Sequence, residues 1–151
     1  MSSPAFGSGF TVSNAINTWI SRGFPASKLN LGLAFYARGW SGVPNGGARG
    51  LYQPVSGPSP SFPFSQQEGV AFYKELKAAG LLTNSNVYFD TITASAWLYD
   101  GSNFYGLEVP HSLRYKLEYF KQKGLGGIMI YSLEDDDADS TLFKAATGAT
   151  N

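Results

Sequence analysis

A dense run of carboxylates near the carboxyl end of the chain is the feature with the clearest potential for chemistry. Residues 134–139 read EDDDAD and follow an apolar run, Ile128 to Tyr131, which has the pattern of a fully buried strand. In α/β folds the carboxyl ends of strands carry the chemistry, so paired carboxylates here could serve as general acid and base. The alternative, which we favour, is a solvated loop that caps the last helix with Asp139 or Ser140, because carboxylates stabilise helix N-termini.

The same run has the alternating acids of a calcium-binding loop at Asp135, Asp137 and Asp139. In such a loop the sixth position is a glycine that allows a sharp turn, and the twelfth is a bidentate glutamate. This sequence has Ser140 and Ala146 at those two positions. A calcium site is therefore a weak interpretation, and we expect no metal.

His111 is the only histidine of the chain, and there is no cysteine. Zinc sites and Ser-His or Cys-His nucleophiles need further partners of these types, so both classes of site are excluded. Because it follows Pro110, the histidine is expected at the entry of a helix. No glycine-rich loop has the sequence setting of a phosphate cradle, which excludes a Rossmann-type site, and we expect no cofactor.

Aromatic residues gather near the ends of predicted strands, where their rings could meet a ligand: Tyr36, Trp40, Tyr52, Tyr88, Phe89, Trp97, Tyr99 and Tyr131. Flat rings are good anchors for the apolar faces of sugars. Arg38, Asp90 and Glu134 could add hydrogen bonds to hydroxyl or acetamide groups. The pattern fits core filling of a small sheet equally well, so both interpretations stay open at this point.

The composition narrows the class of partner. The 151 residues include 11 basic and 11 acidic side chains, and this balance argues against a nucleic-acid partner, which would favour a basic stripe. No apolar run approaches the ~20 residues that a membrane-spanning helix needs. The first ten residues lack the pattern of a secretory signal. The absence of cysteine leaves the redox compartment open.

Periodicity and turn residues predict the elements that would position these side chains. Residues 39–63 are rich in Gly, Pro, Ser and Asn, and we expect a long irregular loop there. Helices are predicted over residues 11–22, 64–79, 112–123 and 142–146. Strands of the buried, parallel type are predicted over 28–35 and 128–131. Antiparallel strands are predicted over 87–90, 95–100 and 103–108.

Three segments resemble glycoside hydrolase family 18 chitinases. Residues 31–40, LGLAFYARGW, with their lead-in over 24–29, resemble the seventh barrel strand of that family. Residues 87–90, VYFD, resemble the Tyr-Trp-Asp of its insertion domain, and residues 112–131 resemble its last helix and eighth strand. The resemblance implies an α/β fold: an incomplete (β/α)8 TIM barrel, strands seven and eight with their helices, that carries an inserted small α+β domain.

The resemblance also implies how the chain is divided. We expect a partial barrel over residues 1–40, the insertion domain over 41–108, and a second partial barrel over 109–151. The family's Asp-x-x-Asp-x-Asp-x-Glu on the fourth strand and Met-Tyr-Asp on the sixth have no counterpart in this sequence. The chain is therefore expected to be the C-terminal portion of such a protein, and no catalytic residue is assigned.

The resemblance implies substrate-assisted chemistry, in which the acetamido oxygen of the sugar attacks the anomeric carbon while a Glu protonates the leaving oxygen. Only sugar contact carries over to this chain. Tyr36 and Arg38 match substrate-facing positions after strand seven, and Tyr131 stands where the family has a Trp under the cleavage subsite. With the side chains named above, the predicted substrate-binding set is Tyr36, Arg38, Trp40, Asp90, Trp97, Tyr131 and Glu134.

We therefore expect a chain that recognises chitin or chitooligosaccharides without cleaving them, and that binds neither nucleic acid nor membrane. Two alternatives stay open. The chain could be half of a split or truncated chitinase, active only with a missing N-terminal barrel half, or a fragment that dimerises through its orphan strands. The resemblance suggests an extracellular parent protein.

Overall fold

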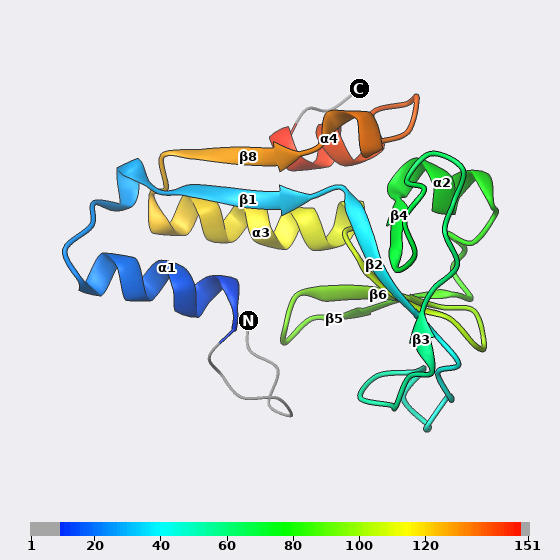
Figure 1. The fold of residues 1–151 in the computed structure, drawn as a ribbon. Helices are drawn as coiled ribbons and strands as arrows, with labels where there is room; N and C mark the ends of the chain where they lie inside the picture. Colours follow the sequence, from blue (N-terminus) through cyan, green and yellow to red (C-terminus); the bar gives the residue numbers. More distant parts are fainter. Residues whose placement is uncertain (1–9, 149–151) are drawn as a thin grey trace.

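The computed structural model describes residues 10–148, and these form an α/β fold (Figure 1). The helices are α1 (Val12–Ser21), α2 (Tyr73–Ala78), α3 (Pro110–Lys123) and α4 (Thr141–Thr147). The strands are β1 (Asn30–Ala34), β2 (Tyr36–Ser41), β3 (Gly57–Pro58), β4 (Val70–Phe72), β5 (Val87–Asp90), β6 (Ser95–Tyr99), β7 (Phe104–Leu107) and β8 (Gly127–Tyr131). Two short 3-10 turns, Ala26–Lys28 and Leu133–Asp135, precede β1 and follow β8.

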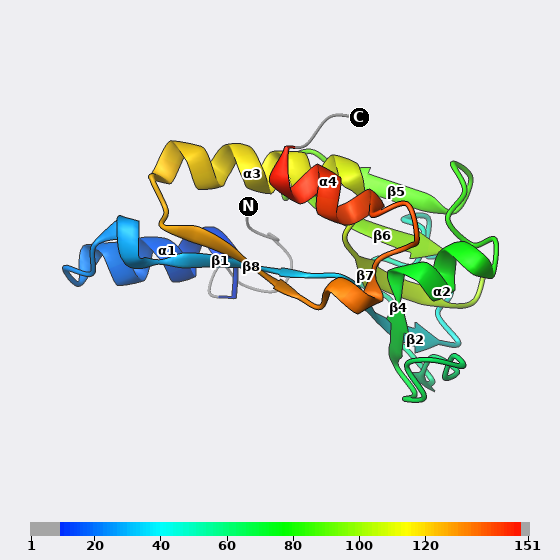
Figure 2. The ribbon, with the colours of Figure 1, turned by 90° about the horizontal axis from the view of Figure 1, so that it is seen from above.

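Strands β1 and β8 form a parallel pair, as their sequence pattern predicts, with Leu31 beside Ile128 and Leu33 beside Ile130. Leu31 and Leu33 are buried in a core shared with α1, α3 and α4. Figure 2 shows α3 and α4 side by side over this pair. The prediction that β8 is fully buried is wrong, because no layer among the described residues covers its other face. Met129 is 51% exposed there.

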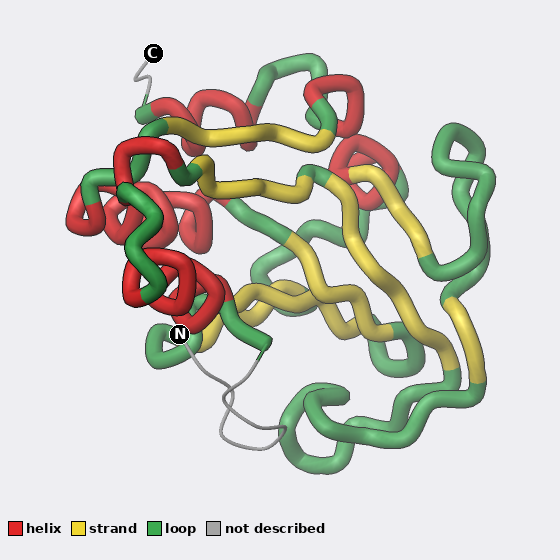
Figure 3. Tube along the Cα trace, turned by 60° about the vertical axis from the view of Figure 1, so that its left-hand side comes forward, coloured by secondary structure: helices red, strands yellow, loops and turns green. Residues whose placement is uncertain are grey.

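The other strands form an antiparallel sheet in the order β3-β2-β7-β6-β5, with β4 also paired to β2 (Figure 3). One face of this sheet packs on a second core, which includes Ala37, Leu98, Tyr105 and Leu76 of α2. Strands β5 to β7 confirm the predicted antiparallel segment, whose alternating side chains and turn residues gave a clear signal.

Two predicted elements are wrong, and both lie around β2. Residues 39–63 are not irregular throughout, because β2 runs to Ser41 and β3 pairs with it. The inward positions of β2 are Ala37 and Gly39, which are too small to give a hydrophobic alternation. A side chain at Gly39 would meet the Tyr105 ring at 2.4 Å, so this position needs glycine.

The helix predicted over 64–79 contains only the short helix α2. Gln66 and Gly69 have positive φ angles of 50° and 74°, which interrupt a helical path, and β4 follows them. The apolar stripe of this segment therefore belongs partly to a strand.

The acidic run caps the last helix, as we favoured, but Asp139 and Ser140 are not the capping side chains. The carboxylate of Asp136 accepts hydrogen bonds from the backbone N–H groups of Leu142 and Phe143, at 3.1 and 2.8 Å. Asp137 accepts one from the N–H of Thr141 at 3.0 Å. The carboxylates thus accept hydrogen bonds from backbone N–H groups at the start of α4 that have no partner within the helix.

Within residues 10–148, no helix is long and apolar enough to cross a membrane. The same residues contain no cluster of three or more side chains that could hold a metal ion. His111 lies at the start of α3, where its ring packs on Phe89 and Tyr115.

Candidate functional site

Four of the seven predicted site residues line one hollow of about 460 Å³, at the carboxyl ends of β1 and β8. We call this hollow the strand-end pocket. Its lining residues are Tyr36, Arg38, Ser65, Gln67, Val70, Phe72, Tyr131, Ser132, Glu134 and Asp135. Segments from β2, β4 and the residues after β8 thus meet at one place, although they are far apart in the sequence.

The parallel pairing of β1 and β8 places two tyrosines together in this pocket. Ala34 lies beside Tyr131 in the register, and the N–H of Phe35 donates to the carbonyl of Tyr131 at 2.9 Å. The next residue, Tyr36, therefore lies close to Tyr131. Their ring centroids are 6.2 Å apart with planes at 84°, and the Arg38 guanidinium carbon lies 5.4 Å from the Tyr36 centroid.

The turn after β8 brings two carboxylates to the pocket in different states of burial. Asp135 is only 2% exposed, and its Oδ2 accepts a hydrogen bond from the N–H of Ser132 at 2.9 Å. Its Oδ1 has no hydrogen-bond partner among the described residues. Glu134 is exposed, and its backbone carbonyl accepts a hydrogen bond from Lys74 Nζ at 2.5 Å. Asp135 thus shapes the turn, while the Glu134 side chain faces solvent.

Glu75 of α2 shapes the opposite wall of the pocket, although it is not itself a lining residue. Its Oε1 accepts hydrogen bonds from the N–H groups of Phe64 and Ser65, at 2.6 and 3.1 Å, and its Oε2 accepts one from Phe72 at 2.9 Å. Burial raises the pKa of Glu75, but these backbone donors outweigh it and hold the pKa below its ordinary value. The ionised carboxylate therefore fixes the loop that carries Ser65 and Gln67.

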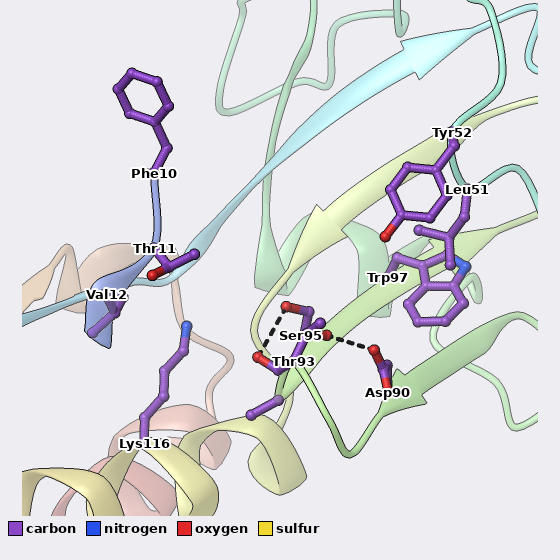
Figure 4. A pocket seen from close by; sticks show the side chains of 11 residues that line it. Phe10, Thr11, Val12, Leu51, Tyr52, Asp90, Thr93, Ser95, Trp97 and Lys116 are labelled. Atoms are coloured by element: carbon purple, nitrogen blue, oxygen red, sulfur yellow. Dashed lines mark hydrogen bonds between the residues drawn. The ribbon is translucent and has the colours of Figure 1, made fainter. Parts of the chain in front are cut away.

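Asp90 and Trp97 line a second hollow of about 370 Å³, which we call the β5–β6 pocket (Figure 4). Asp90 accepts hydrogen bonds from the N–H of Ile92 at 2.9 Å and from the hydroxyl of Thr93 at 2.8 Å. These bonds lower the pKa of Asp90 and engage both of its oxygens in the β5–β6 turn. Trp97 Nε1 donates to the carbonyl of Arg49 at 3.1 Å. The remaining lining residues are Phe10, Thr11, Val12, Leu51, Tyr52, Thr93, Ala94, Ser95 and Lys116.

The two pockets are joined by one face of the antiparallel sheet. The register places Arg38 beside Gly106 and Gly106 beside Trp97, so these three residues form a row across β2, β7 and β6. Directly opposed residues of antiparallel strands point to the same face, which here is the face away from the second core. A Cβ atom at Gly106 would meet nothing within 4 Å, so the middle of the row is open.

Trp40 lies on this same face but lines neither pocket. It is two residues from Arg38 along β2, is 38% exposed, and has its ring centroid 6.1 Å from that of Phe104. The predicted set is thus divided between the strand-end pocket, the β5–β6 pocket and the sheet face between them. Whether each side chain contacts sugar remains a prediction.

Comparison with known proteins decides the family. The model of glycosyl hydrolases family 18 matches residues 1–136. The chain belongs to glycosyl hydrolase family 18. It is 31% identical to Chitinase 63 of Streptomyces plicatus over 137 residues, which is 91% of this chain and 20% of that relative. It is 36% identical to Chitinase A1 of Niallia circulans over 130 residues, which is 84% of this chain and 18% of that relative.

Solved family 18 structures have the same fold. A class V chitinase mutant from Nicotiana tobaccum, in complex with NAG4, has a TM-score of 0.82 at 25% identity, over 97% of this chain and 40% of that one. A family 18 chitinase from Cycas revoluta, in complex with (GlcNAc)3, has a TM-score of 0.78 at 29% identity, over 93% and 39%. The chain spans about a fifth of the length of the curated Streptomyces and Niallia relatives.

Sequence reasoning missed several residues that build the strand-end pocket. Ser65, Gln67 and Glu75 lie in the segment for which a continuous helix was predicted. A glutamate at the third position of a helix can reach back to the residue before it, and this signal could have placed the helix start near Phe72. The open position at Gly106 had no sequence signal, because it depends on the register of three strands.

Proposed function

We propose that this chain binds β-1,4-linked N-acetylglucosamine chains in the strand-end pocket and along the adjoining sheet face. The observation that carries the proposal is the approach of the Tyr36 and Tyr131 rings, with Arg38 and Glu134 beside them. Tyr131 is 65% exposed, so its ring can receive the apolar face of a sugar. The guanidinium of Arg38 supplies donors and Glu134 supplies acceptors for hydroxyl and acetamide groups.

Family membership supports this choice of ligand. The relatives are chitinases by name, and two of the solved structures contain N-acetylglucosamine oligomers. The zero formal charge of the chain also suits a neutral polysaccharide. The open row from Arg38 through Gly106 to Trp97 offers a path for a ligand longer than the strand-end pocket.

We propose recognition without hydrolysis as the activity of this chain alone. A general acid for glycoside cleavage depends on burial to keep its proton. Of the two carboxylates in the strand-end pocket, Glu134 is exposed and Asp135 is engaged by Ser132. Asp135 is the buried one of the two, but it lies in the turn after β8, and the family's acid motif on the fourth strand has no counterpart in this sequence.

The test is a calorimetric titration of the chain with a chitin hexamer, with the same samples assayed for shortened products. Saturable binding without cleavage is the expected result. Tyr131→Ala should weaken binding, while Tyr115→Ala, a change at a tyrosine on α3 that lines neither sugar pocket, should leave it unchanged. Cleavage by the isolated chain would contradict the recognition-only proposal, and absence of binding would contradict the sugar-binding site.

A second candidate function is a chitinase completed by companion strands, and the exposed face of β8 favours it. We propose that β1 and β8 are the seventh and eighth strands of an eight-stranded barrel and that β2 to β7 belong to the inserted domain. Among residues 10–148, strand β2 pairs with β3, β4 and β7 alone, so we place the first boundary before Tyr36 rather than after residue 40. The units proposed over 1–40 and 109–151 extend outside the described residues.

Mixing experiments would test this second candidate. If the chain is one half of a chitinase, addition of an N-terminal barrel half from a family 18 relative should produce hexamer cleavage that neither part shows alone. Light scattering of the chain alone would distinguish a monomer from a self-associating fragment. Stable mixed complexes without cleavage would contradict the split-enzyme candidate.

A further inference from the structure

The short helix α2 contacts the segments on both sides of the strand-end pocket through three charged side chains. Glu75 holds the loop that carries Ser65, as described above. Lys74 and Lys77 reach in the other direction, to the residues that follow β8. The helix therefore connects the two walls of the pocket without lining it.

Lys77 makes the outermost of these contacts. Its Nζ lies 2.7 Å from Oδ2 of Asp137 and 3.1 Å from Oδ2 of Asp139. Hydrogen bonds to Asp137 and then to Asp139 raise the pKa of Lys77 above its ordinary value, so the side chain stays charged. Asp137 is the carboxylate that also accepts hydrogen bonds from the N–H and hydroxyl of Thr141, at 3.0 and 2.7 Å. One carboxylate therefore joins α2 to the start of α4.

The residues between these anchors belong to the pocket. Tyr131 and Glu134 lie just before Asp137 in the chain, and the Lys74 contact to the Glu134 carbonyl lies between them and α2. At the other end, the N–H of Tyr73 donates to the carbonyl of Phe35 at 3.1 Å. Helix α2 is thus anchored beside both tyrosines of the pocket, Tyr36 and Tyr131.

We propose that Lys77 is a positioning residue, which holds the turn carrying Glu134 at the distance from Tyr36 and Arg38 that a sugar requires. This inference rests on the proposed sugar binding. It predicts that sugar affinity depends on ionic strength, and this dependence cannot come from the ligand, because a chitin oligomer is uncharged. Lys77 and Asp139 have side chains that are 44% and 78% exposed, so dissolved salt screens their attraction, whereas Asp137 is 6% exposed and its attraction to Lys77 is screened less. Affinity for a neutral sugar should therefore fall as ionic strength rises.

The experiment compares the wild-type chain with Lys77→Met, Lys77→Arg and the matched control Lys121→Met. Lys121 forms an exposed pair with Glu118 at 3.4 Å, on α3 and outside the strand-end pocket. Hexamer affinity is measured at about 50 mM and about 1 M NaCl, where the screening length falls from over 10 Å to about 3 Å. Amide hydrogen exchange is followed at Thr141, Leu142 and Phe143, which report on the carboxylate turn without sugar.

In the wild type, high salt should weaken hexamer binding by about two- to fivefold, the range for a partly exposed ion pair. Lys77→Met should have the weaker affinity at both salt concentrations and faster exchange at the three amides. Lys77→Arg, which keeps the charge, should restore both, and Lys121→Met should behave as the wild type.

Two failures can be told apart. If the wild type does not bind the hexamer, the proposed function is overturned and the inference with it. If the wild type binds but Lys77→Met has the same affinity, the same salt response or unchanged amide exchange, the positioning role alone is overturned. A loss of affinity that Lys77→Arg fails to restore also overturns it, because charge would not be the cause.

Discussion

The β1–β8 pair and the antiparallel sheet differ in how much of their environment this chain provides. The sheet has a core of its own on one face, with Leu98 and Leu76 fully buried, and it presents aromatic and polar side chains on the other. The pair buries Leu31 and Leu33 under three helices but exposes Met129 and Tyr131. The strand-end pocket lies where the two meet, so the proposed sugar recognition would depend both on a sheet with a core of its own and on a strand pair with an exposed face.

The largest expected effect is on the free energy of unfolding, which should depend more on the core of the antiparallel sheet than on the β1–β8 pair. Leu98→Ala opens a cavity in the core of the sheet and should lower the free energy of unfolding by about 3–5 kcal/mol. Ile130→Ala on the half-buried β8 should cost only about 1–2 kcal/mol, because less apolar surface is lost. Urea unfolding measures both. Equal losses would show that the pair is as well packed as the sheet.

Ligand length should separate the two pockets. Tyr36→Ala removes a ring of the strand-end pocket and should weaken binding of both a chitin dimer and a hexamer, by roughly 1–3 kcal/mol if the ring stacks on sugar. Trp97→Ala should weaken only the hexamer, since its ring lies two strands away from Arg38. Calorimetric titrations with the two ligands measure this. Trp19→Ala, at a tryptophan of α1 that is 56% exposed, is the control.

If Trp97→Ala leaves hexamer affinity unchanged and the fold intact, the ring belongs to the sheet and not to the site. The contact of its indole N–H with Arg49 and of its ring with Tyr88 would then be its whole role.

A pH titration of stability tests whether Glu75 holds the loop that forms one wall of the strand-end pocket. The pKa of Glu75 lies below its ordinary value, so its carboxylate stabilises the fold above the unfolded pKa of about 4.3 and loses that contribution as pH falls through the folded pKa. Glu75→Gln should cost about 1 kcal/mol near neutral pH and give a stability curve that falls less steeply in acid. Urea unfolding at several pH values checks it. Parallel curves for the two proteins would contradict the capping role.

The smallest expected effect on stability is at the open position of the sheet face. Gly106→Val adds a side chain whose Cβ has no atom within 4 Å, so the free energy of unfolding should change by no more than about 0.5 kcal/mol. The same change fills the row between Arg38 and Trp97 and should weaken hexamer binding while leaving dimer binding unchanged. Calorimetry with the two ligands measures this. Equal affinity for the hexamer would exclude the sheet face from the site.

How far the sequence predicts the fold depends on the size of the inward-facing residues. Strands β5 to β8 and helices α1, α3 and α4 have large apolar side chains at regular spacing, and all were predicted. Strand β2 was missed because Ala37 and Gly39 are its inward residues. The start of α2 was wrong because backbone reversals at Gln66 and Gly69 leave no trace in hydropathy.

Residues of the candidate site can be predicted to lie together only where they directly follow strands that pair with each other. Tyr36, Arg38, Tyr131 and Glu134 follow the ends of two paired parallel strands, so their meeting follows once the pairing is known. The supporting contacts of Glu75 and Lys77 could not be predicted, because they join segments about 60 residues apart or lie in a misassigned helix.

The two outer edges of the β1–β8 pair have a consequence for assembly. One edge belongs to β1 and the other to β8, so a copy that docks on one of them leaves its own opposite edge open, and a two-fold dimer cannot satisfy both. Repetition of this contact either continues as a filament or closes into a ring. Either way, one contact between two copies would leave a β1 edge and a β8 edge still unpaired.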